Sequence, residues 1–152
     1  MSAQQVVSIQ SEAFDTVADF AALSHPEVGG LASFVGLVRD LAGQDTVSAM
    51  TLEHYPGMTE KRLAEIEAEA RARWPLESVL IIHRSGRLEP GDRIVLVATT
   101  SSHRQAALES CAFLIDWLKT KAPFWKLEQG SKGAAWVEAK ASDDRAAEKW
   151  KR

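Results

Sequence analysis

The sequence predicts an α+β fold, with a mostly antiparallel sheet and two main helices packed on it. Apolar residues recur at helical spacing in two long segments, residues 59–73 and 103–121. A Trp-Pro pair ends the first segment and an Ala-Pro pair ends the second, because the residue before proline avoids the helical region. Short runs rich in β-branched residues surround both segments and are typical of strands.

Seven short segments are predicted to be strands. They are Val6–Ile9, Leu31–Val38, Val47–His54, Ser78–His83, Arg93–Thr100, Phe124–Glu128 and Ala135–Ala139. A turn containing Gly and Pro, at residues 89–92, joins the fourth and fifth segments, so we expect these two to pair as a hairpin. A shorter helix is expected at Phe14–Leu23, and Thr59 is the expected N-cap of the first long helix.

The length of the chain, 152 residues, suits one compact domain with a sizeable core. No repeat, low-complexity tract or long linker divides it, so we expect residues 1–152 to form a single domain. Residues 142–152 are highly charged, and Trp150 is the one large apolar residue among them. We therefore expect this segment to be a charged, mobile tail.

Composition excludes several classes of function. The net charge of −3 argues against a general nucleic-acid binder, which would carry a strong basic excess. No apolar run approaches the roughly 20 residues that span a bilayer, and the N-terminus lacks the pattern of a signal peptide. A single cysteine, Cys111, cannot form an internal disulfide. A cytoplasmic protein without membrane association is the expected class.

The segment Thr99–Gln105 has the pattern of an anion site. A predicted strand runs directly into a predicted helix, and Ser102 followed by Gln105 fits a capping box. His103 and Arg104 would then lie in the first helical turn, where free backbone N–H groups already favour anions such as phosphate. The alternative is that both side chains simply point into solvent.

Three lysines cluster at the end of the second long helix: Lys119, Lys121 and Lys126. Lysines are common at helix C-termini because they interact favourably with the dipole there, so a structural role is one interpretation. Lys119 directly follows Leu118 on the apolar stripe and so lies at the border of the buried face. A lysine that is partly desolvated can act as a base, an acid or a nucleophile, which is the functional interpretation.

The other candidates have weaker signals. Arg39 ends a predicted strand and could reach a ligand, or it could pair with Asp40. The histidines share no metal-ligand spacing with one another or with Cys111, so no metal site is expected. Cys111 lies on the apolar stripe and is expected to be a small core residue.

In their order along the chain, several blocks resemble the large, catalytic subunits of molybdopterin synthase, the MoaE family. The blocks are Phe34–Arg39, Leu52–Met58, Ile82–Arg84 with Gly86 and Pro90–Asp92, Ser101–Lys126, and Trp136–Ala139. The termini and the loop at residues 42–47 fall outside the resemblance. Each block alone is a weak signal, but the whole set in order is specific.

The resemblance implies an α/β hammerhead-type fold and a sulfurtransferase of molybdenum cofactor biosynthesis. The implied enzyme is a homodimer within a heterotetramer, in which each large subunit binds a small, ubiquitin-like sulfur carrier. The carrier's Gly-Gly tail ends in a thiocarboxylate. Its sulfur is transferred to cyclic pyranopterin monophosphate to make the dithiolene of molybdopterin. No metal or organic cofactor is implied, because the sulfur arrives already activated.

The resemblance also assigns roles to residues. Lys119 falls on the family's catalytic lysine and Lys126 on a second pocket lysine. The implied substrate-binding positions are Leu37, Val38, Arg39, His103, Arg104, Lys119, Lys126, Leu127 and Glu128. These positions lead us to expect one cationic pocket. Lys140 stands where the family often has an arginine contributed by the second protomer, and lysine lacks the bidentate fork of arginine.

Two other classes of function compete with this hypothesis. A non-catalytic binding module would hold a ubiquitin-like tail or a phosphorylated ligand without turnover, but such a module has no need of both Lys119 and Lys126. A phosphate-ester hydrolase or acyltransferase could use His103, yet the sequence offers no evident nucleophile, base and acid to complete that site.

Overall fold

The computed structural model describes residues 4–39, 47–122, 124–130, 133–137 and 141–151. Strands within these ranges form two four-stranded sheets. The first sheet has the order β1 (Gln4–Gln10), β4 (Ser78–Arg84), β6 (Arg93–Ser101) and β2 (Gly30–Leu37). The second has the order β5 (Gly86–Leu88), β3 (Val47–His54), β7 (Phe124–Gly130) and β8 (Gly133–Val137).

The strand pairing is mostly antiparallel, as expected from the sequence. Only β1 and β4 are parallel among the pairs described. The predicted hairpin is confirmed, because β4 and β6 pair antiparallel with Ile81 opposite Val97. Its connection is more elaborate than a simple turn. After β4 the chain leaves the first sheet and forms β5, which pairs with β3 in the second sheet and places Leu88 opposite Met50. This short strand links the two sheets.

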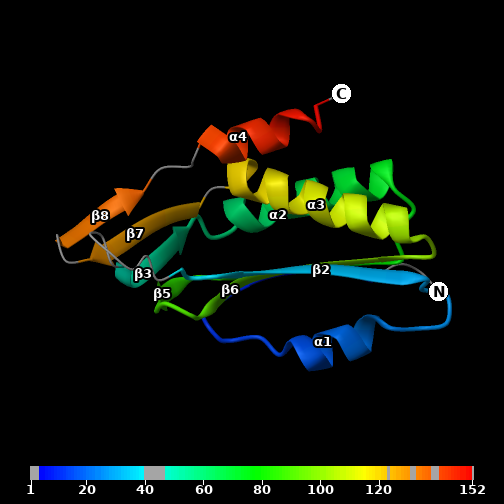
Figure 1. Ribbon diagram of the computed structural model, residues 1–152, viewed down its shortest axis with the longest axis horizontal. Coiled ribbons are helices and arrows are strands. Elements are labelled where there is room, and N and C mark those ends of the chain that lie inside the picture. The colour runs from blue at the N-terminus through cyan, green and yellow to red at the C-terminus, as the bar shows by residue number, and fades with distance from the viewer. Residues whose placement is uncertain (1–3, 40–46, 123, 131–132, 138–140, 152) are drawn as a thin grey trace.

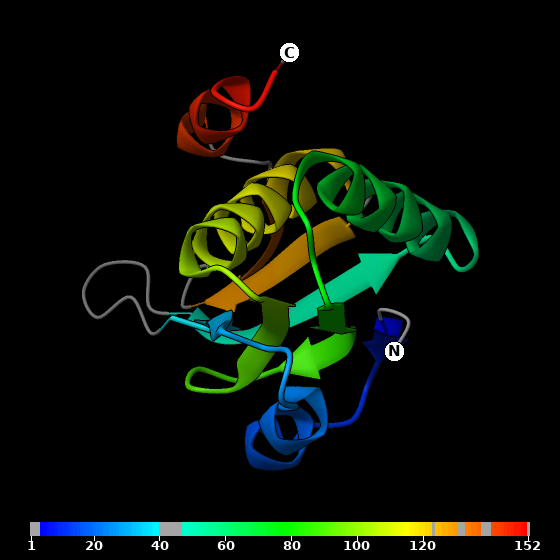
Figure 2. The same ribbon diagram turned by 90° about the vertical axis from the view of Figure 1, so that its right-hand side faces the viewer.

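The central strands of the first sheet are buried on both faces. Along β4, Val79 and Ile81 face the helices α2 (Met58–Arg73) and α3 (Arg104–Lys121). The alternate residues Leu80 and Ile82 face α1 (Thr16–Leu23) on the other side. Figure 1 and Figure 2 show α2 and α3 on one face of the sheet and α1 on the opposite face. The two predicted long helices are therefore confirmed, and the short helix completes a three-layer arrangement.

The N-cap of helix α2 lies two residues before the predicted one. It is Gly57, whose φ of 86° lies in the left-handed region that glycine adopts without strain. The predicted N-cap, Thr59, is wrong: it lies inside the helix, fully buried, and its hydroxyl accepts a hydrogen bond from the Tyr55 N–H at 3.0 Å. Glu60 accepts from the Gly57 N–H at 3.0 Å and so supplies the side-chain capping contact.

The charged C-terminal segment differs from the expected mobile tail. Residues Ala141–Glu148 form helix α4, and Trp150 beyond it packs edge-on against Trp74 and Phe113, with centroid separations of 5.7 and 5.6 Å. The indole N–H of Trp150 donates to the Asp116 carboxylate at 2.6 Å. The one large apolar residue of the segment therefore anchors it to α2 and α3.

Candidate active site

The predicted cations lie at opposite ends of α3. His103 is the N-cap of this helix, Arg104 is its first residue, and Lys119 is in its last turn. Sixteen residues separate His103 from Lys119, which corresponds to about 24 Å at the 1.5 Å rise of an α-helix. Figure 1 shows α3 extended along the first sheet, with the second sheet beyond its C-terminal end. The expectation of one pocket is therefore wrong for a single chain.

Lys119 occupies the border position that the apolar pattern predicts. It is half-buried, and the preceding residue, Leu118, is buried in the main core. Lys121 in the same turn is exposed, and its ammonium lies 4.9 Å from the centre of the Trp117 ring. The two lysines therefore differ in environment, and Lys119 is the more desolvated of the two.

The end of β2 brings Arg39 to the same end of the molecule as Lys119. Because β2 runs antiparallel to β6, Leu37 at the end of β2 pairs with Arg93 at the start of β6. Helix α3 follows β6 and runs back along the sheet, so its C-terminal end lies near the same strand ends. Val38 is buried, and both its backbone groups bond to the turn before β6: its N–H donates to Asp92 at 2.9 Å and its carbonyl accepts from Gly91 at 2.8 Å. Leu37 and Arg39 on either side are exposed.

The start of β7 is the third component of this end. β7 pairs with β3, and Lys126 lies opposite Leu52. Leu52 in turn packs with Val38 in the small core between β2, β3 and β5. The backbone of Lys126 is thus placed near the ends of β2 and α3. Leu127 and Glu128 follow it, opposite Thr51 and Met50. The side chains of residues 126–128, and all of Lys140, lie outside the described part of the chain.

The opposite end of α3 is built differently from the predicted capping box. The Ser101 hydroxyl, rather than that of Ser102, accepts a hydrogen bond from the His103 N–H at 3.3 Å, and it donates to the Pro75 carbonyl at 2.7 Å. The Ser102–Gln105 box is therefore wrong, because the cap falls one residue later than predicted. His103 and Arg104 are exposed, and their predicted place at the helix N-terminus is confirmed.

Two glycines at the start of β2, Gly29 and Gly30, lie close to the start of α3. The Gly29 N–H donates to the Ser101 carbonyl at 2.9 Å. A Cβ on Gly29 would lie 2.1 Å from the Ser102 carbonyl oxygen, and one on Gly30 would lie 3.4 Å from the Arg104 Cα. Glycine is therefore required at Gly29 for β2 to start so close to α3.

Cys111 has the environment expected of a core residue. It is buried among the apolar side chains of α3 and the first sheet, and burial raises the pKa of its thiol to about 11. Within the described ranges, no group of three or more His, Cys, Asp or Glu side chains is arranged to hold a metal ion.

Comparison with known proteins identifies the family. Residues 9–121 match the family model described as MoaE protein. The molybdopterin synthase catalytic subunit of Pseudomonas aeruginosa is 51% identical over 146 residues, covering 95% of this chain and 97% of that protein. The Escherichia coli catalytic subunit is 56% identical over 124 residues, covering 82% of this chain and 83% of that protein.

Solved structures share the same fold. The MoaE protein of Burkholderia ambifaria superposes with a TM-score of 0.83 at 53% identity, covering 97% of this chain and 98% of that one. Molybdopterin synthase from Staphylococcus aureus has a TM-score of 0.80 at 30% identity, covering 86% and 95%. A Helicobacter pylori structure, described as a protein–protein complex of subunits 1 and 2 of molybdopterin-converting factor, shares the fold at 19% identity, with a TM-score of 0.68 and 89% of each chain covered.

The fold and these relatives define a sulfur-transferring enzyme of molybdenum cofactor biosynthesis. The chain belongs to the MoaE protein family, the catalytic subunits of molybdopterin synthase. The resemblance seen in the sequence, the α+β class and the enzymatic role are thereby confirmed.

Proposed function

We propose that this chain transfers sulfur from the C-terminal thiocarboxylate of a small, ubiquitin-like carrier to cyclic pyranopterin monophosphate. The product is the dithiolene of molybdopterin, and two thiocarboxylates are consumed for each product. The observation that carries the proposal is the position of Lys119, half-buried in the last turn of α3, at the end of the molecule where β2 ends and β7 begins.

Lys119 and Lys126 are the proposed catalytic residues. A partly desolvated ammonium stabilises an anion more strongly than one in bulk water, because the local dielectric is lower. Lys119 would hold the anionic thiocarboxylate while its sulfur attacks the precursor. The two lysines would then exchange protons with the reacting groups as a phosphate oxygen leaves the attacked carbon and as water cleaves the resulting thioester, which leaves the sulfur on the precursor and a carboxylate on the carrier. Leu37, Arg39, Leu127 and Glu128 would line the same end of the molecule.

His103 and Arg104 would serve the pocket of a second copy of the chain. They lie about 24 Å along α3 from Lys119, so an isologous dimer with the two α3 helices running in opposite directions would bring them beside the partner's lysine. β2 is an edge strand, α3 packs on it, and both expose large apolar side chains, with Phe34 at 37%, Leu37 at 54% and Leu108 at 63%. These features support a homodimer with two shared pockets.

The proposed assembly is a heterotetramer with one carrier at each end of the homodimer. The Helicobacter pylori structure is described as a complex of two subunits, which supports a second, different subunit here. A slim Gly-Gly tail would pass between the pocket walls, and its terminal thiocarboxylate would be drawn to the cations. Lys140 remains a proposed contribution from the second protomer.

The proposed compartment is the cytoplasm, the reducing environment that a free, buried cysteine favours. As a separate finding, none of the helices in the described ranges is long and apolar enough to cross a membrane.

The decisive experiment compares two lysines from one helical turn. Lys119→Ala should abolish conversion of the precursor by thiocarboxylated carrier, while Lys121→Ala should leave the rate within about twofold of wild type because its ammonium lies over Trp117. Truncating either side chain should cost little stability, since neither is in the core. The assay measures molybdopterin formed by purified chain, carrier and precursor. Near wild-type turnover by Lys119→Ala would reject the proposed catalytic role.

A further inference from the structure

We infer that His83 and Phe124 form an aromatic joint between the two sheets, and that this joint positions the backbone of Lys126 relative to Lys119. The inference rests on the catalytic roles proposed above for the two lysines. It assigns a task to the histidine of the Ile82–Arg84 block, which the reaction itself leaves unused. His83 and Phe124 are positioning residues, since they would act through the lysines.

The joint is a face-to-face stack of two rings from different sheets. The ring centroids of His83 and Phe124 are 3.8 Å apart and the ring planes differ by 16°. His83 is on β4 of the first sheet and is 6% exposed, whereas Phe124 is the first residue of β7 in the second sheet. Phe124 also packs against the main core beneath α2 and α3. The second sheet is thus attached to the first at the start of β7.

A hydrogen bond to the chain holds the imidazole in this orientation. His83 Nδ1 lies 2.8 Å from the Arg84 carbonyl oxygen, which accepts the Nδ1 proton. His54 lies opposite Phe124 in the β3–β7 ladder, with ring centroids 6.4 Å apart. Phe124 is therefore held between its own sheet and a ring whose orientation β4 determines.

Phe124, one half of the joint, lies between the two lysines in the sequence. Phe124 comes five residues after Lys119 and two residues before Lys126. The connection is tight, because α3 ends at Lys121 and the Phe124 N–H donates to the Ala122 carbonyl at 3.0 Å. Lys119 belongs to α3 on the first sheet, while Lys126 belongs to β7 in the second. A contact at Phe124 therefore controls how the two lysines are spaced.

The ladder with β3 would keep β7 paired without the stack, but the position of the second sheet relative to α3 would then be less restricted. Catalysis is sensitive to such a change, since a misplacement of about 1 Å can cost roughly 100-fold in rate. The structure therefore predicts a loss of turnover that exceeds any loss of carrier or precursor binding.

The test uses three substitutions of His83 in the assembled enzyme, assayed with thiocarboxylated carrier and precursor. His83→Phe keeps a flat ring and lacks the Nδ1 hydrogen bond to the Arg84 carbonyl. His83→Leu fills the volume without a flat ring, and His83→Ala removes the contact. We expect kcat within about threefold of wild type for the phenylalanine variant and reduced by about tenfold or more for the other two, with KM for the precursor changed less than threefold.

The matched control is Ile82→Ala, on the same strand with a similar exposure of 6% but facing α1 instead of the joint. It should lower stability without lowering kcat at temperatures where it is folded. If His83→Ala does not fold, His83→Leu and His83→Phe still give the comparison. Equal kcat for these two variants, or an equal loss in Ile82→Ala, would overturn the inference. An active Lys119→Ala would instead overturn the proposed function.

Discussion

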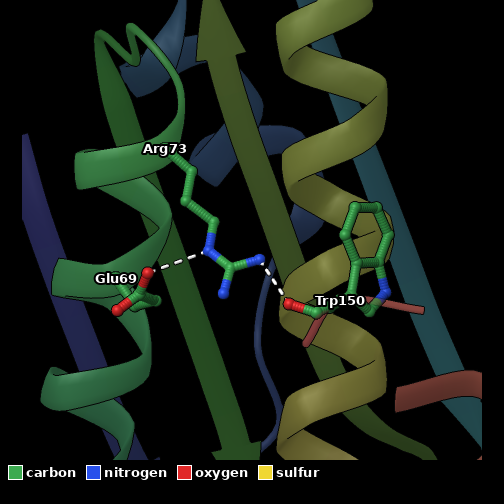
Figure 3. Close-up of polar contacts among 3 residues, drawn as sticks. All are labelled: Glu69, Arg73 and Trp150. Atoms are coloured by element: carbon green, nitrogen blue, oxygen red, sulfur yellow. Dashed lines mark hydrogen bonds and ion pairs between the residues drawn. The ribbon is translucent and has the colours of Figure 1, made fainter. Parts of the chain in front are cut away.

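The guanidinium of Arg73 donates a hydrogen bond to the backbone carbonyl of Trp150, 77 residues later in the chain, at 2.7 Å (Figure 3). The same guanidinium donates to Glu69 at 2.8 Å and lies 4.8 Å from the centre of the Phe113 ring. A hydrogen bond, an ion pair and a cation–π contact thus meet at one side chain. They join the C-terminal end of the chain to α2 and α3.

Trp150→Ala should lower the free energy of unfolding by about 2–3 kcal/mol, because it removes a half-buried indole from the contacts with Trp74 and Phe113. It also leaves the Asp116 carboxylate without this donor. The control is Lys151→Ala, which removes an exposed ion pair with Glu148 worth at most about 1 kcal/mol. Urea denaturation of both variants measures the difference, and equal midpoints would contradict the anchoring role of Trp150.

Gly29→Ala should be more harmful than Gly57→Ala. At Gly29 the new Cβ would meet the Ser102 carbonyl oxygen at 2.1 Å, so the start of β2 or of α3 has to move, at a cost of about 2–3 kcal/mol or more. At Gly57 no atom lies within 4 Å, but the positive φ still costs about 1 kcal/mol. Thermal unfolding compares the two, and a smaller effect at Gly29 would show that the junction is not closely packed.

Arg104→Ala should weaken binding of the precursor by about 1.5–3 kcal/mol, the range for a hydrogen bond to a charged group. Affinity for the carrier should change far less, because Arg104 is proposed to contact the phosphate of the precursor, whereas Lys119 is proposed to hold the carrier's thiocarboxylate. Calorimetry with each ligand separately provides the measurement. Unchanged precursor affinity would remove phosphate recognition from the start of this helix.

At a precursor concentration too low to saturate Arg104→Ala, a mixture of Lys119→Ala and Arg104→Ala chains should regain activity that neither variant has alone. In a mixed dimer, one pocket would hold both substitutions and the other would hold neither. After random exchange half of the dimers are mixed, so about one quarter of the wild-type activity should return. The control mixes two preparations of Lys119→Ala. If the mixture of different variants is as inactive as this control, the pocket is not shared between copies.

Cys111 should react slowly with thiol reagents in the folded protein. With its pKa raised from 9.0 to about 11, the thiolate population at pH 8 is about 100-fold smaller than for an ordinary thiol, and burial slows access further. The raised pKa also affects stability. Above pH 9 the unfolded chain releases the thiol proton while the folded chain keeps it. The free energy of unfolding should therefore fall as the pH rises from 9 to about 11.

The measurements are the rate of labelling in native and denaturing conditions and the unfolding free energy as a function of pH. Cys111→Ala is the control, since it removes this part of the pH dependence. Fast labelling of the native protein at pH 8 would contradict the buried environment.

Local patterns determined most of the secondary structure. The strand at Val47–His54 has the predicted bounds, and the end of α3 at Lys121 agrees with the proline two residues later. The border position of Lys119 also follows from the apolar stripe of its helix. These features depend on neighbours a few residues away, through side-chain periodicity and the limits that proline places on the backbone. A sequence contains such information directly.

Caps and the C-terminal helix were decided by distant contacts. The Ser101 hydroxyl bonds to Pro75 as well as to the start of α3, and Thr59 is buried in the interior. Charge alone predicts a free tail after residue 141, but Trp150 packs against Trp74 and Phe113, which are distant in the sequence. Burial of one indole and its polar contacts outweighs the solvation preference of the charged neighbours.

The positions of the cations likewise depend partly on local sequence and partly on tertiary contacts. The predicted helix length already contained the distance of about 24 Å between His103 and Lys119, so sequence alone could have separated them. Only the tertiary structure decided which strands lie near the end of α3, because the β2–β6 and β3–β7 pairings and the His83–Phe124 stack join segments far apart in the sequence. Pairing partners are chosen by the packing of whole sheets and helices, which no local pattern encodes.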